Sequence, residues 1–96
     1  MAKIYIAGKV SGLTRTAASR KFGSYQKILM NQGHDPVVPL DLVDHGDTWA
    51  QCMKKCIAAM VTCDEVHLLP CWTDSPGAMI ERTLAKDLGM EIKYVK

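Results

Sequence analysis

The chain has 96 residues, 48% of them hydrophobic and 23% charged, with a formal net charge of +2. These values predict one domain spanning residues 1–96 and exclude wholesale disorder. The apolar stretches are too short for a membrane span, and the first residues lack a signal-peptide layout, so we expect a cytoplasmic protein without a membrane partner. Nucleic acid is not an expected partner either, because no aromatic-rich basic stripe or known reader motif occurs.

Basic residues are concentrated in the first third of the chain. Residues 1–30 contain six lysines and arginines and no acidic residue. Such an imbalance suits a phosphate-bearing ligand or an acidic partner surface, although a solvated helix face would have the same composition.

The four cysteines raise the question of a disulfide or a metal site. They are Cys52, Cys56, Cys63 and Cys71. Without a secretory signal we expect reduced, mostly buried thiols. Zinc bound with His45 or His67 is the alternative, but no Cys-x-x-Cys pair occurs, so we expect neither a metal nor a cofactor.

The first half of the chain alternates strand and helix patterns. Residues 3–7 predict a buried strand that ends at Gly8, and residues 16–32 have the apolar spacing of a helix that Gly33 would terminate. Residues 35–39 predict a short extended segment, and their prolines place it at a sheet edge.

The second half continues the alternation. Residues 48–51 form a capping-box pattern, which opens a helix with Trp49, Met53, Cys56 and Met60 on one face. Residues 65–69 predict the third strand. A third helix follows over residues 76–88, ending at Gly89, and residues 91–95 predict the last strand.

Strands that alternate with helices in this way predict a three-layer α/β fold of the flavodoxin or Rossmann-like type. We expect a small, mainly parallel four-stranded sheet in the order 2-1-3-4, with helices on both faces. In such a sheet ligands bind beyond the carboxyl ends of strands 1 and 3. The loops at residues 8–12 and 70–76 are therefore predicted to frame the site.

Glu81 is the strongest candidate for a functional side chain at this place. Helical side chains lean toward the helix N-terminus, so its carboxylate should project over Gly77, where the missing side chain would leave open space. Glu81 shares a face with Leu84, Ala85 and Leu88, the expected core-facing stripe, and no basic residue lies one turn away. A partly desolvated carboxylate without a local counter-charge is typical of functional sites, although a structural ion pair with a distant residue is the alternative.

Five further candidates surround Glu81. Ser75, followed by Pro76, is the expected N-cap of the third helix, and its hydroxyl with the free backbone N–H groups of Gly77 and Ala78 could bind an anion or a hydroxyl group. Asp74 could be a catalytic acid or a turn residue. Trp72 could stack on a base or pack against the core.

Several segments of the chain also resemble a known family. Residues 3–8, 63–64, 84–89 and above all 69–81, with the pattern Leu-Pro-x-Trp-x-x-Ser-x-Gly-Ala-x-x-Glu, resemble the nucleoside 2-deoxyribosyltransferase superfamily, in particular its short bacterial and phage branch. The resemblance spans nearly the whole chain. It implies an enzyme acting on the N-glycosidic bond of a nucleoside or nucleotide, and a homo-oligomer whose neighbouring subunit completes the pocket.

The resemblance also implies roles for individual residues. Glu81 would be the nucleophile that attacks the anomeric carbon of the sugar, and Tyr5, in strand 1, would orient it. A core tyrosine without such a role is the alternative for Tyr5. The first loop would lie against base and sugar through Gly8, Lys9, Ser11 and Gly12.

Three positions depart from the family pattern. Lys9 stands where many relatives have proline, and Cys56 stands where many have an aspartate that helps protonate the base. Ser75 replaces an aspartate of the transferases and is more typical of the nucleoside-monophosphate N-glycosidases. Three functions thus stay open: a transferase, a nucleotide hydrolase and a non-catalytic nucleotide-binding module.

Overall fold

The computed structural model describes residues 1–10 and 13–96 and is an α/β domain. Its strands are β1 (Lys3–Ala7), β2 (Asp35–Val37), β3 (Glu65–Leu68) and β4 (Glu91–Tyr94). Its helices are α1 (Arg15–Asn31), α2 (Trp49–Met60) and α3 (Pro76–Asp87), with short 3-10 helices η1 (Pro39–Asp41) and η2 (Trp72–Asp74). All strand pairs are parallel and the sheet order is β2-β1-β3-β4, which confirms the predicted topology.

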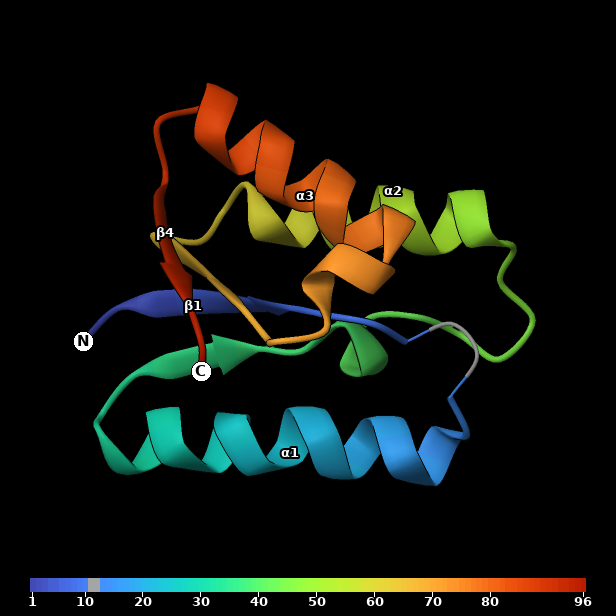
Figure 1. The fold of residues 1–96 in the computed structure, drawn as a ribbon, viewed down its shortest axis with the longest axis horizontal. Coiled ribbons are helices and arrows are strands. Elements are labelled where there is room, and N and C mark those ends of the chain that lie inside the picture. The colour runs from blue at the N-terminus through green and yellow to red at the C-terminus, as the bar shows by residue number, and fades with distance from the viewer. Residues whose placement is uncertain (11–12) are drawn as a thin grey trace.

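The three helices cover the sheet unequally. Helices α2 and α3 lie on one face and α1 lies on the other (Figure 1). Because side chains alternate along a strand, Ile4 and Ile6 of β1 pack toward α1, whereas Tyr5 and Ala7 enter the core beneath α2 and α3. The alternation therefore places the Tyr5 ring on the face where α3 carries Glu81.

The helix ends that the sequence predicted lie within one residue of the observed ones, because local side chains and glycines terminate the hydrogen-bond pattern. Thr48 and Gln51 form the reciprocal capping box at the start of α2. Gly33 and Gly89 follow α1 and α3 with φ angles of 84° and 72°, a backbone conformation that disfavours other residues. None of the helices in the described part of the chain is long and apolar enough to cross a membrane.

Two local expectations were wrong. Strand β2 ends at Val37, and Pro39 begins η1 because its ring suits a first helical position and cannot donate to a sheet. Leu88 is 55% exposed, whereas the buried members of the α3 stripe are Glu81 and Ala85. Leu88 is the C-cap residue of α3, directly before the turn at Gly89.

Candidate functional site

A pocket opens at the carboxyl ends of β1 and β3, where the sheet order reverses direction. It is a cavity of about 120 Å³. Its walls come from β1 and the residues after it, η1 and the loop that follows, α2, and the first turns of α3. The lining residues are Tyr5, Gly8, Val10, Pro39, Leu40, Val43, Trp49, Cys52, Met53, Cys56, Ser75, Gly77, Ala78 and Glu81.

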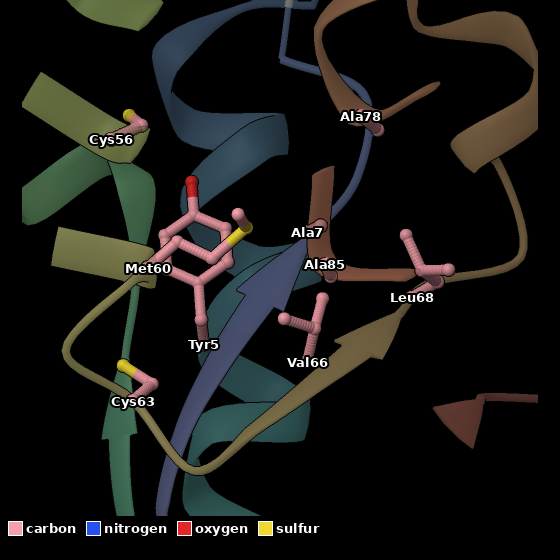
Figure 2. Close-up of a cluster of buried hydrophobic side chains, with 9 residues drawn as sticks. All are labelled: Tyr5, Ala7, Cys56, Met60, Cys63, Val66, Leu68, Ala78 and Ala85. Carbon is pink, nitrogen blue, oxygen red and sulfur yellow. The ribbon is translucent and has the colours of Figure 1, made fainter. Parts of the chain in front are cut away.

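A short hydrogen bond joins the two ionisable oxygens at the inner end of this pocket. The Tyr5 hydroxyl donates to Glu81 Oε2 at 2.5 Å, across 76 residues of sequence. Both side chains are buried, with Glu81 only 4% exposed. Figure 2 shows Tyr5 rising from β1 into the cluster beneath α2, with its hydroxyl on the side of Cys56. The predicted pairing of Tyr5 with Glu81 is thus present in the structure.

The second carboxylate oxygen of Glu81 faces the pocket. Within residues 1–10 and 13–96, no donor reaches Oε1 and no basic side chain forms a salt bridge with Glu81. Every fully buried polar side-chain atom in this part of the chain has a partner, so Oε1 is accessible from the cavity. One oxygen is therefore held by Tyr5, and the other accepts no hydrogen bond from the described residues.

Burial controls the acidity of the three titratable groups here. Desolvation raises the pKa of Glu81 to about 7, although the hydrogen bond from Tyr5 opposes this rise. Burial, and next the negative charge of Glu81, hold the pKa of Tyr5 far above its usual range, so Tyr5 keeps its proton. Burial also raises the pKa of the Cys56 thiol to about 11. At neutral pH the site thus contains one group near its midpoint and two neutral donors.

The start of α3 differs from its predicted form in two ways. The space above Gly77 is not open, because a Cβ atom there would lie 2.9 Å from the Met53 Sδ atom of α2. The N–H group of Ala78 is not free either, since it donates to Ser75 Oγ at 3.1 Å. Gly77 therefore serves the close approach of α2 to α3, and Ser75 is an N-cap that also lines the pocket.

The contact at Gly77 makes a stability difference measurable. We expect Gly77→Ala to stabilise the protein less than Gly23→Ala, which should gain roughly 0.5–1 kcal/mol because alanine favours a helix over glycine. At Gly23 a new Cβ has nothing within 4 Å, whereas at Gly77 it must displace Met53. Urea unfolding of both variants measures the difference, and an equal gain would show that Met53 moves without cost.

Three predicted site residues lie outside the pocket lining. Trp72 packs against Tyr94, with ring centroids 5.7 Å apart, and Arg82 lies 5.5 Å from its ring. Asp74 is exposed at the end of η2, and Lys9 is half-buried. The structure thus gives Trp72 its packing alternative, and no contact joins Asp74 to Glu81. Ser11 and Gly12 lie outside the described residues.

Six of the fourteen lining residues were not foreseen from the sequence. Pro39, Leu40 and Val43 follow β2, whereas the prediction placed the site only at the loops after β1 and β3. The α2 residues had a visible signal, since Trp49, Met53 and Cys56 share the helix face noted in the sequence. In the structure this face belongs partly to the core, through Cys56 and Met60, and partly to the pocket wall, through Trp49, Met53 and Cys56.

The chemistry of the lining is that of a small-molecule site. No group of three or more His, Cys, Asp or Glu side chains in the described part of the chain is placed to hold a metal ion. Cys52, Cys56, Cys63 and Cys71 are free thiols, Cys56 and Cys63 buried. A mostly apolar cleft with a few convergent polar groups, one of them with a shifted pKa, is the usual form of a binding or active site.

Comparison with known proteins gives one result that extends along the chain. No curated protein matches it. Residues 2–94 match the family described as a domain of unknown function, DUF4406. Since this match covers the sheet, all three helices and the pocket between them, the chain belongs to the DUF4406 family.

Proposed function

We propose that this protein is an enzyme that breaks the N-glycosidic bond of a nucleoside or nucleotide through a covalent intermediate on Glu81. The observation that carries the proposal is the pair of carboxylate oxygens, one fixed by Tyr5 and the other facing the cavity. The resemblance of residues 69–81 to the nucleoside 2-deoxyribosyltransferase superfamily supports it. A buried carboxylate without a counter-charge lowers stability, and functional sites are where such groups are retained.

In the proposed reaction, Oε1 of ionised Glu81 attacks the anomeric carbon, and the bond from that carbon to the base nitrogen breaks. The base leaves with the bonding electrons and takes up a proton, while the sugar becomes esterified to Glu81. Water or a second base then attacks the same carbon and releases the carboxylate, with net retention. Throughout both steps the Tyr5 hydroxyl holds Oε2, so that Oε1 keeps its direction.

The proposed reaction needs a proton for the leaving base, and the site offers only a weak acid to supply it. Cys56 has a pKa of about 11 and is a weak acid at neutral pH. Proton donation from water would then be needed, which favours substrates whose base is a good leaving group. The same weak acid makes a non-catalytic nucleotide-binding module the second candidate, since binding does not require base protonation.

The proposal includes two classes of substrate, a nucleoside with a free 5′-hydroxyl group and a nucleotide with a 5′-phosphate. No lysine or arginine belongs to the pocket lining in the described part of the chain. Arg15 contacts the pocket lining from outside, because its guanidinium donates to the backbone carbonyl of the lining residue Leu40 at 3.4 Å. Ser75 retains its own hydroxyl proton for a phosphate or sugar oxygen, since it only accepts from Ala78. We also propose that a second copy of the chain completes the pocket, as in the superfamily.

Incubation with nucleosides, deoxynucleosides and their 5′-monophosphates, followed by chromatography of free base, tests the proposal. We expect base release that increases as the pH rises through about 7, because only ionised Glu81 is nucleophilic. A rate that depends on the 5′-phosphate would identify the hydrolase, and base exchange would identify the transferase. Ligand binding without base release from any of these compounds would contradict the enzyme and support the non-catalytic nucleotide-binding module.

A further inference from the structure

The pocket extends along one face of α2 from a buried inner end to an exposed mouth. Trp49, Cys52, Met53 and Cys56 line it at helical spacing. Cys56 is 6% exposed and lies near Tyr5, whereas Trp49, seven residues earlier, is 52% exposed. Seven residues of helix span about 10 Å, so the lining that α2 contributes extends over about that length.

The two ends of this cavity differ in chemistry. The inner end carries the oxygens of Glu81 and Tyr5, and Ser75 lines the cavity at the start of α3, six residues before Glu81. Away from these three, the lining is apolar or sulfur-containing, and Trp49 is its largest aromatic surface. A ligand that fills such a cavity has a polar part next to Glu81 and a flat apolar part toward the mouth.

Trp49 is also positioned before any ligand arrives. It is the first residue of α2, directly after the capping box of Thr48 and Gln51. Lys55 holds the preceding loop by ion pairs to Asp44 Oδ2 at 2.9 Å and Asp47 Oδ2 at 2.6 Å. An aromatic residue at a capped helix start, half-exposed and lining a cavity, provides contact area with few side-chain torsions to immobilise on binding.

From these observations we infer that Trp49 is the stacking surface for the nucleobase, with the sugar held at Glu81 and the base directed toward the mouth. The assignment rests on the proposed function for the class of ligand, and on the pocket alone for the position of its flat part. It gives to Trp49 the stacking role that the sequence had suggested for Trp72, whose ring instead contacts Tyr94. Base–aromatic stacking tolerates different bases, so Trp49 contributes affinity more than choice of base.

The chain has two tryptophans, which allows a direct test by fluorescence titration. Free adenine and free thymine are added separately to wild type, Trp49→Phe and Trp72→Phe. A parallel titration of tryptophan amide in solution corrects for the excitation light that the base absorbs. We expect saturable quenching in wild type and in Trp72→Phe, where Trp49 is the only indole, and none in Trp49→Phe. Circular dichroism shows that each variant is folded.

Enzyme kinetics provide the second arm. Trp49→Ala should raise KM for base release by roughly tenfold or more, with a smaller change in kcat, and Trp49→Phe should retain most of the affinity. Quenching of Trp72 alone, or base release with an unchanged KM in Trp49→Ala, would overturn the inference and leave the proposed function standing. Saturable quenching of Trp49 without base release from any nucleoside would support the inference and overturn the proposed enzyme.

Discussion

Glu81→Gln is expected to abolish base release and, above pH 7, to make the protein more stable than the wild type. Loss of the nucleophile should lower kcat by on the order of 10⁴-fold, as removal of catalytic nucleophiles does in other enzymes. Glutamine retains an oxygen that accepts from Tyr5, so the pocket keeps its shape. Steady-state base release by the two proteins at pH 8 measures the first effect.

The stability effect follows from the raised pKa of Glu81. Folding raises this pKa from the ordinary 4.5 to about 7, so between these values the folded protein holds a proton that the unfolded chain has lost. The free energy of unfolding therefore decreases as the pH rises through this window, by about 3 kcal/mol in total. Glutamine cannot ionise and escapes this decrease, so the difference from wild type should be largest above pH 7 and small below pH 4.5.

Glu91→Gln is the matched control for both measurements, because Glu91 is an exposed glutamate on β4. It should leave base release unchanged and alter the free energy of unfolding only slightly at any pH. Urea unfolding at pH 5 and pH 8 compares the three proteins. Full base release by Glu81→Gln, or a loss of stability at pH 8, would contradict the assigned role and the desolvated state of Glu81.

Tyr5→Phe is expected to move the pH profile of base release to higher pH. The Tyr5 hydrogen bond lowers the pKa of Glu81 against the effect of burial, so its removal raises that pKa further. An ionised Oε2 would then lie buried without a donor, which costs roughly 1–3 kcal/mol of stability. This loss should be greater at pH 8 than at pH 5, where the carboxyl group is protonated. Rate profiles and urea unfolding at the two pH values measure both effects.

Tyr25→Phe controls for the loss of a tyrosine hydroxyl elsewhere in the core. Tyr25 hydrogen-bonds to His67 Nδ1 at 2.6 Å and lies on α1, across the sheet from the pocket. This variant is expected to lose some stability and to keep the pH profile of base release unchanged. If Tyr5→Phe behaved like Tyr25→Phe, Tyr5 would be a core residue without influence on Glu81.

The sequence by itself determined the elements, their order and the end of the sheet at which the pocket opens. Buried strands, the Thr48–Gln51 capping box and the glycines after α1 and α3 are local features, and parallel strands joined by helices leave few topologies. The inward direction of Glu81 was also readable, because it follows from helical period and from the burial of Ala85 one turn later.

Only the tertiary structure decided what surrounds that carboxylate. For Tyr5 the sequence left two roles open, a partner of Glu81 or a plain core residue, and the fold chose the first across 76 residues of sequence. The approach of Met53 to Gly77 was not expected at all, because it depends on how α2 packs against α3. The choice between the two tryptophans also depends on the tertiary structure. Tyr94 and Arg82 pack against Trp72, whereas Trp49 lines the pocket, and we therefore propose Trp49 as the stacking residue. Periodicity and caps act within a few residues, whereas a pocket is formed by side chains that only the folded chain brings together.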